Sequence, residues 1–123
     1  MNDLYIGLGS IFVGVMFLVK YSMGGAQRIS SRVARMMLKS NEITKVIDVR
    51  TKTEYDIGHH PGSVHVPLGS LNAAAMRGTR KDTGILVYCN TGQRARAGAE
   101  LLRDLHYTNV YYISGPYTSL KST

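Results

Sequence analysis

The sequence predicts an α/β domain with a mainly parallel sheet, preceded by one hydrophobic helix. Short apolar runs at 84–88 and 109–113 are typical of buried strands. Segments with helical spacing alternate with such runs, and this alternation favours crossover connections and a parallel sheet. The chain has 123 residues, which leaves room for one globular domain.

The hydrophobic helix is predicted from Leu4 to Val19, a stretch without a charged residue. Extended to residue 23, it approaches the roughly 17–25 residues that span a bilayer. Basic residues follow it, so the positive-inside rule places the globular part in the cytosol. We therefore expect a single-pass membrane anchor at 1–23 that contacts lipid through 4–23, a flexible joint at 24–27, and the domain at 28–123.

Two other interpretations of this stretch stay open. A secretory signal cleaved after Ala26 is sterically allowed and would export the domain, although a signal normally begins with basic residues. A helix buried inside a soluble domain is disfavoured, because the stretch is apolar on every side.

The composition is basic, with 15 Lys and Arg against 8 Asp and Glu. Several of the basic residues directly follow the apolar stretch: Lys20, Arg28, Arg32, Arg35 and Lys39. No basic stretch is interleaved with aromatic residues, so we expect no nucleic-acid partner. The single cysteine excludes an intrachain disulfide and leaves too few thiolates for a cysteine-based metal site. The sequence leaves the oligomeric state open.

The first helix of the domain is predicted at 28–39, with Ser30 or Ser31 as its N-cap. Its apolar residues at helical spacing are Ile29, Val33, Met36 and Met37. This amphipathic pattern indicates a helix packed on the domain, and the basic residues also allow it to lie on a membrane surface.

The remaining elements follow in order. A strand at 45–50 ends in polar residues, and a short helical or turn segment follows at 51–58. If that segment is helical, Arg50 and Glu54 can pair at i, i+4. The next predicted elements are a turn at 59–62, a brief strand at 63–67, a short helix at 71–76 and a polar loop at 77–84.

Cys89 lies between the predicted strand at 84–88 and a predicted helix at 94–105. In such a position, unpaired backbone N–H groups and the positive end of the helix dipole favour the thiolate. Arg94 and Arg96 add two positive charges, so we expect the pKa of Cys89 to lie below its usual value of about 8.5. Cys89 is therefore the candidate catalytic nucleophile, although a lone cysteine can also be a buried structural residue.

The loop after Cys89 is the candidate substrate-binding site, because N–H groups at a helix start cradle anions. Gly92 allows a turn with positive φ in this loop. Arg94 suits an anionic substrate, although it can also face solvent. The expected substrate-binding residues are Asn90, Thr91, Gly92, Gln93, Arg94 and Ala95.

Two stretches together resemble the rhodanese family. Residues 47–68 resemble the pattern (I/L)-D-V-R-x-x-x-E-(F/Y)-x-x-G-H-(I/L)-P-G-A-x-x-(I/V)-P-L, and residues 88–94 resemble Y-C-x-x-G-x-R. The resemblance covers one rhodanese domain, from about Arg28 to Leu120. It implies a five-stranded parallel sheet flanked by helices.

The resemblance also implies a sulfurtransferase that needs no metal or organic cofactor. Cys89 would take sulfur from a small anionic donor such as thiosulfate and pass it, as a persulfide, to a thiol or cyanide. Four further residues match the family pattern and are expected to be structural: Asp48, Arg50, Glu54 and His59. We expect His59 to hydrogen-bond to backbone near its turn.

Two other functions stay open. A membrane-tethered module of the same fold could bind a partner without physiological sulfur transfer. Phosphatase activity is disfavoured, because related cysteine phosphatases have five residues between cysteine and arginine, whereas four residues separate Cys89 from Arg94.

Overall fold

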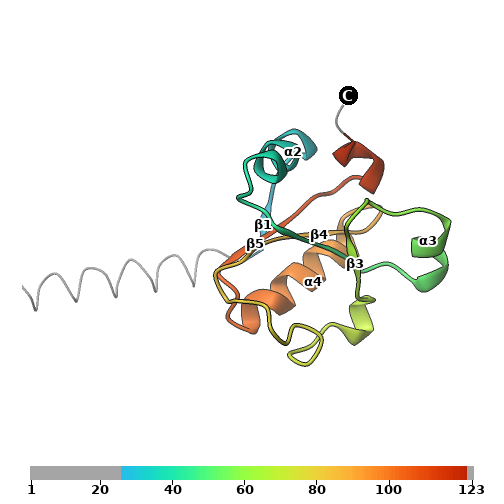
Figure 1. The fold of residues 1–123 in the computed structure, drawn as a ribbon. Coiled ribbons are helices and arrows are strands. Elements are labelled where there is room, and N and C mark those ends of the chain that lie inside the picture. The colour runs from blue at the N-terminus through green and yellow to red at the C-terminus, as the bar shows by residue number, and fades with distance from the viewer. Residues whose placement is uncertain (1–25, 122–123) are drawn as a thin grey trace, which may run out of the picture.

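Five strands form one sheet in the computed structural model, which describes residues 26–121 (Figure 1). Their spatial order is β1-β5-β4-β2-β3, and every neighbouring pair is parallel. The strands are β1 (Gln27–Arg28), β2 (Lys45–Asp48), β3 (Val64–His65), β4 (Gly84–Tyr88) and β5 (Asn109–Tyr112). The predicted parallel sheet is confirmed within the described residues.

β4 is the central strand, and its sequence explains why. All of its residues are buried, and its apolar run matches a strand that is covered on both faces. In the register of the sheet, Val87 lies between Ile47 of β2 and Tyr112 of β5.

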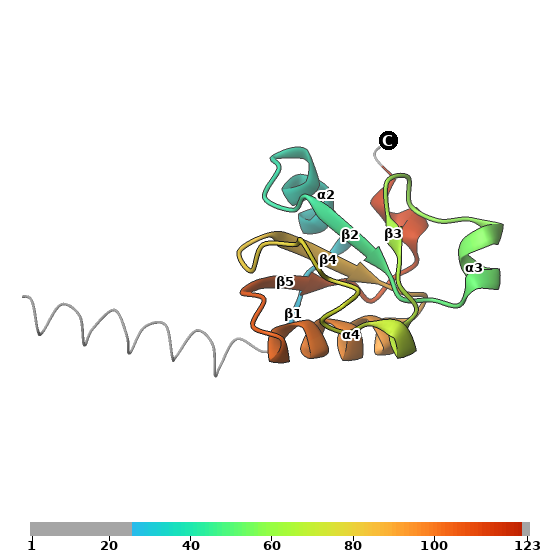
Figure 2. The same ribbon diagram turned by 60° about the horizontal axis from the view of Figure 1, so that its bottom comes forward.

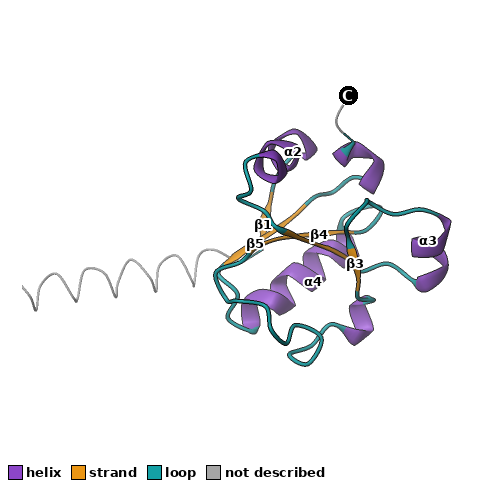
Figure 3. Cartoon of the chain, viewed as in Figure 1, coloured by secondary structure: helices purple, strands orange, loops and turns teal. Residues whose placement is uncertain are grey.

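Helices cover both faces of this sheet (Figures 2 and 3). Their bounds are α2 (Ser31–Lys39), α3 (Lys52–Ile57) and α4 (Gln93–Asp104), with short 3-10 turns η1 (Leu68–Ser70) and η2 (Tyr117–Leu120). α4 lies on one face and α2 with η2 on the other, whereas α3 stands away from the sheet. This arrangement gives three layers.

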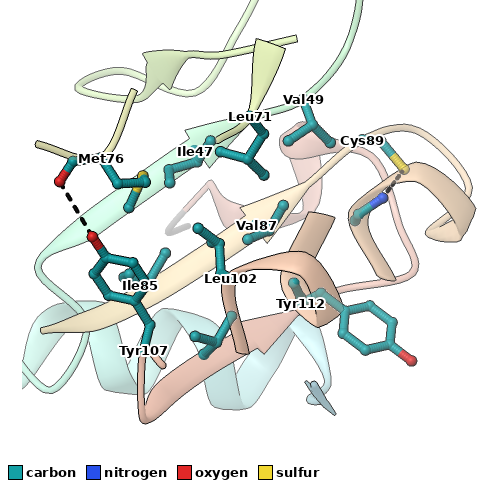
Figure 4. Close-up of a cluster of buried hydrophobic side chains, with 13 residues drawn as sticks. Ile47, Val49, Leu71, Met76, Ile85, Val87, Cys89, Leu102, Tyr107 and Tyr112 are labelled. Atoms are coloured by element: carbon teal, nitrogen blue, oxygen red, sulfur yellow. Dashed lines mark hydrogen bonds between the residues drawn. The ribbon is translucent and has the colours of Figure 1, made fainter. Parts of the chain in front are cut away.

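The two faces bury separate hydrophobic clusters. Alternate residues of β4 point to opposite faces, as the pleat requires. Ile85, Val87 and Cys89 belong to the cluster under α4, which Figure 4 shows. Leu86 and Tyr88 belong to the cluster under α2. The side chains of Tyr88 and Cys89 therefore lie on different sides of the sheet.

The predicted helix at 28–39 begins later than expected. Residues 27–28 form β1 instead, and Ser30 is the N-cap, whose hydroxyl accepts a hydrogen bond from the N–H of Val33 at 3.1 Å. Of the four apolar residues expected to pack on the domain, Ile29 and Met37 contact the core, whereas Val33 and Met36 are 41% and 61% exposed.

The predicted helix at 71–76 is wrong. Successive turns replace it, with i to i+3 hydrogen bonds from the N–H of Met76 to Ala73 and from that of Arg77 to Ala74. The side chain of Asn72 accepts from the N–H of Ala75 at 3.0 Å, and such local side-chain bonds compete with a helix. Met76 is buried beneath these turns.

The predicted anchor at 1–23 and the first two residues of the joint at 24–27 lie outside the described residues. Among residues 26–121, no helix is both long and apolar enough to cross a bilayer.

Candidate active site

The loop after β4 is shaped by Gly92, which has φ of 99° and precedes the first turn of α4. A Cβ at this position would lie 2.8 Å from Cα of Ser114, so both the conformation and the space require glycine. The predicted positive φ is confirmed. The turn directs the N–H groups of the loop inward, toward Cys89.

The sulfur of Cys89 accepts two backbone hydrogen bonds. The N–H of Gly92 lies 3.1 Å from Sγ and the N–H of Ala95 lies 3.2 Å from it. Figure 4 shows the sulfur at the end of the row of buried side chains, with one of these bonds dashed. These donors lie at the start of a 12-residue helix, where N–H groups stabilise negative charge that develops on a bound atom. The geometry therefore suits a nucleophile.

Cys89 is nevertheless only 1% exposed. In the loop that follows it, Asn90 and Thr91 are exposed, whereas Gly92 is buried. Gln93 is also exposed, and Ala95 is buried at the first turn of α4. A substrate can react with Sγ only when the residues that bury it move apart.

Glu54 of α3 bridges two predicted substrate-binding residues. Its carboxylate accepts hydrogen bonds from both terminal nitrogens of Arg94, at 2.7 and 3.0 Å, and from Nδ2 of Asn90 at 2.6 Å. The hydrogen bond to Arg94 is the largest influence on Glu54 and holds the pKa of its carboxyl well below the usual range. The same bond raises the pKa of Arg94, so the two groups form a charged pair.

The predicted pairing of Arg50 with Glu54 is wrong. Thr51 is the N-cap of α3 and is extended, with ψ of 162°, so Arg50 and Glu54 are not on one helix. Thr51 and Glu54 form a capping box instead, in which each side chain receives the backbone N–H of the other.

Arg50 pairs with Asp48 inside the protein. Nη2 of Arg50 lies 2.7 Å from Oδ2 of Asp48 and donates to the carbonyl of Gly58, also at 2.7 Å. The guanidinium also lies 5.5 Å from the ring centroid of Tyr88 and 5.1 Å from that of Tyr117. Burial alone would raise the pKa of Asp48, but the hydrogen bonds from Arg50 and Tyr88 outweigh it and lower that pKa.

Tyr88 joins this network to the turn before β3, a role that the sequence reasoning missed. Its hydroxyl donates to Asp48 at 2.7 Å, accepts from the N–H of His60 at 3.0 Å, and lies 3.2 Å from Oγ of Ser63. Burial is the main reason that the pKa of Tyr88 rises to about 12. The signal available in the sequence was the strand alternation, which turns Tyr88 away from Cys89 toward the other face.

His59 hydrogen-bonds to backbone, as was predicted, and its partner is Tyr55 of α3. Its Nδ1 lies 2.9 Å from the carbonyl oxygen of Tyr55, and its ring stacks on the Tyr55 ring with centroids 3.7 Å apart. His60 is half-buried, and this burial lowers its pKa, with a smaller effect of His59. Neither ring is hydrogen-bonded to the loop of Cys89 in the part of the chain that the structure describes.

The arginines around the loop are all paired with carboxylates. Arg50 pairs with Asp48, Arg94 with Glu54, and Arg96 with Glu100 at 3.0 Å on the exposed face of α4. The surplus of positive charge that the sequence predicted at the loop is thus cancelled locally. Within residues 26–121, no three histidine, cysteine or acidic side chains gather as a metal site would require.

Comparisons with known proteins show the family of the domain and its fold. The family model described as Rhodanese-like domain matches residues 30–123. The chain is 27% identical over 108 residues to the thiosulfate:glutathione sulfurtransferase of Homo sapiens, and the match covers 77% of this chain and 93% of that protein. It is 30% identical over 87 residues, or 71% of its length, to the adenylyltransferase and sulfurtransferase uba4 of Ogataea parapolymorpha.

This second match covers 22% of the fungal protein, and the chain spans 21–44% of three other curated relatives. Among solved structures, a human single-domain sulfurtransferase superposes with a TM-score of 0.67 at 24% identity, covering 80% of this chain and 100% of that one. A rhodanese with anions from E. coli gives a TM-score of 0.56 at 25% identity, covering 64% and 93%.

Proposed function

The chain belongs to the rhodanese-like domain family, and on this premise we propose that it is a sulfurtransferase in which Cys89 carries sulfane sulfur as a persulfide. One observation carries the proposal: Sγ of Cys89 lies at the carboxyl end of the central strand and accepts N–H bonds from Gly92 and Ala95. Relatives that are named sulfurtransferases support the reaction class.

In the first half of the reaction, the thiolate of Cys89 attacks the outer sulfur of a donor such as thiosulfate. A new S–S bond forms to Sγ while the S–S bond of thiosulfate breaks, and its electron pair leaves with sulfite. In the second half, a thiolate or cyanide attacks the outer sulfur of the persulfide. The electron pair of the S–S bond then returns to Sγ, and a persulfide or thiocyanate is released.

The protein groups of the loop have separate tasks in this scheme. The N–H groups of Gly92 and Ala95 stabilise negative charge on sulfur before and after each attack. Arg94 and Asn90 belong to the same region, and they can reach the part of the donor that leaves only when Glu54, which bonds to both, gives way. A thiol such as glutathione is a natural acceptor to test, because the human relative is named for it.

The test is the rate of thiocyanate formation from thiosulfate and cyanide by the full-length chain, compared with Cys89→Ser. We expect the variant to lose all measurable activity, since no other thiol is present in the chain. A thermal melting curve controls for folding. Equal rates for the two proteins would refute the proposal.

A binding role without turnover is the second candidate, and the burial of Cys89 is the observation in its favour. On this alternative, the loop stays closed over the sulfur in solution. The test is the rate at which a thiol-reactive probe labels Cys89 in the folded protein. A labelling rate equal to the rate of global unfolding would favour this binding role. Labelling that is much faster than unfolding would favour the sulfurtransferase.

We further propose that residues 1–23 anchor the protein as a single pass, with the domain of residues 28–123 in the cytosol. The described helix α2 supports a membrane location: Arg32 and Lys39 have no ion-pair partner among residues 26–121, and Met36 is 61% exposed beside them. Retention of the chain in carbonate-washed membranes, with the domain open to protease from the cytosolic side, is expected. A soluble, shortened, exported chain would instead indicate signal cleavage.

A further inference from the structure

Glu54 sits at the outer side of the Cys89 loop and holds it at two points. Asn90 is the first residue after Cys89, and Arg94 is in the first turn of α4. The carboxylate of Glu54 bonds to both, so one side chain from α3 connects the beginning and the end of the loop.

The same contact removes the positive charge that an anionic donor would use. The fork of Arg94 is occupied bidentately by Glu54, which is the geometry in which arginine binds a carboxylate or another oxyanion. The low pKa of the Glu54 carboxyl means that this charge is present throughout the neutral range. A second oxyanion at Arg94 must displace Glu54 or lie beside its negative charge.

What remains to attract an anion is the pair of N–H groups that point at Sγ. These dipoles suit the single charge of a thiolate or a persulfide sulfur. Neither Arg50 nor Arg96 adds a free charge, because each has its own carboxylate partner. The site is therefore less favourable for a dianion than its arginine content suggests.

We propose that Glu54 is a specificity-determining residue, which neutralises Arg94 and makes the site favour sulfur donors with one negative charge over dianionic thiosulfate. This inference rests on the proposed sulfurtransferase function. It assigns the donor class as monoanions that carry a terminal sulfur, such as thiosulfonates and persulfides.

Two donors isolate the effect of charge. Thiosulfate and methanethiosulfonate transfer the same terminal sulfur, but a methyl group replaces one charged oxygen in the second. With methanethiosulfonate, the S–S bond to Cys89 forms as the donor S–S bond breaks, and the electron pair leaves with methanesulfinate. The quantity to compare is the ratio of kcat/KM for the two donors.

The test variant is Glu54→Gln in the full-length chain. Glutamine keeps one oxygen that can accept the capping hydrogen bonds from Thr51. It removes the charge, and it replaces the oxygen that accepts from Asn90 and Arg94 with an NH2 donor. Asp56→Asn is the matched control, because it removes one negative charge from the same helix at an exposed pair with Lys52. Asp56 makes no ion pair with the loop within the described residues.

We expect wild type and Asp56→Asn to prefer methanethiosulfonate. In Glu54→Gln, kcat/KM for thiosulfate should rise roughly fivefold relative to kcat/KM for methanethiosulfonate, because KM for thiosulfate falls. A change of about fivefold is what removal of one partly exposed charge produces. Unchanged selectivity would overturn the inference. An equal loss with both donors would also overturn it, because Glu54 would then only brace the loop.

A binding measurement separates this inference from the proposed function. In Cys89→Ser, which cannot form a persulfide, the amide chemical shifts of Gly92 and Ala95 report donor binding without chemistry. Adding Glu54→Gln should tighten binding of thiosulfate more than that of methanethiosulfonate. If no persulfide forms with any donor, the proposed function fails, whereas this titration still decides the role of Glu54. Equal changes in the affinity for both anions would overturn the proposed role of Glu54 in donor selectivity.

Discussion

Two arginine–carboxylate pairs lie near the end of β4, and they have the same closest distance but different surroundings. Asp48 and Arg50 approach to 2.7 Å with side chains 0% and 5% exposed. Glu54 and Arg94 also approach to 2.7 Å, but their side chains are 27% and 36% exposed. All four residues come from the two sequence stretches that resemble the family pattern.

The difference in burial predicts different roles for the two pairs, the first in stability and the second in donor selectivity. The buried pair has further partners in Tyr88 and the carbonyl of Gly58, so neither charge is left unsatisfied. Water can compete for the exposed pair, whose net contribution to stability is therefore small. A contact that opens at little cost can regulate access to a loop, whereas a buried one fixes the fold that carries the loop.

Arg50→Met should have the largest effect on stability. It leaves the carboxylate of Asp48 buried without its counter-charge, and breaking a buried pair in this way costs about 3–5 kcal/mol. Urea unfolding followed by circular dichroism measures the free energy of unfolding. A loss below 1 kcal/mol would show that the pair does not hold the fold.

Tyr88→Phe should come next, with a loss of about 1–3 kcal/mol. It removes the hydroxyl that donates to Asp48 and accepts from His60, and so leaves a buried carboxylate and a half-buried N–H each short of a partner. Tyr117→Phe is the control, because it keeps the ring that lies over Arg50. Equal losses in the two variants would refute the assigned role of the Tyr88 hydroxyl.

Acid should weaken the buried pair without any substitution. The folded pKa of Asp48 is below its unfolded value of about 3.9, so its contribution is present above pH 4 and is lost as the pH falls through the folded pKa. Unfolding free energies measured from pH 6 to pH 2.5 should therefore fall below about pH 4. Asp48→Asn should flatten this dependence, and an equally steep fall in that variant would contradict the assignment.

Glu54→Gln should have the smallest effect on stability, roughly 0.2–1 kcal/mol at neutral pH, as expected for a partly exposed pair. Its main effect should be on donor selectivity. A loss comparable to that of Arg50→Met would contradict the comparison, because the exposed pair would then also fix the fold.

The central part of the fold was predictable because local patterns determine it. The apolar run 84–88, Cys89 and the helical spacing after Gly92 correspond closely to β4, the loop and α4. β1 was missed because Gln27 and Arg28 carry no strand pattern. They become a strand only by pairing with Tyr111 and Tyr112 of β5.

The electrostatics of the site were not predictable in the same way. Arg94 was expected to supply positive charge, but its partner Glu54 lies 40 positions earlier and meets it only in the folded chain. The pairing of Arg50 with Glu54 was predicted from sequence spacing. It failed because Thr51 begins the helix after Arg50. Sequence spacing predicts contacts within one element, whereas contacts between elements depend on the fold.

The most direct test of the central role of Cys89 is the intact mass of the full-length chain after incubation with thiosulfate, or with methanethiosulfonate, before and after reduction. We expect a gain of one sulfur atom that a reductant removes and that is absent in Cys89→Ser. An unchanged mass with both donors, in a protein that melts cooperatively, would contradict the assignment of Cys89 as a sulfur carrier.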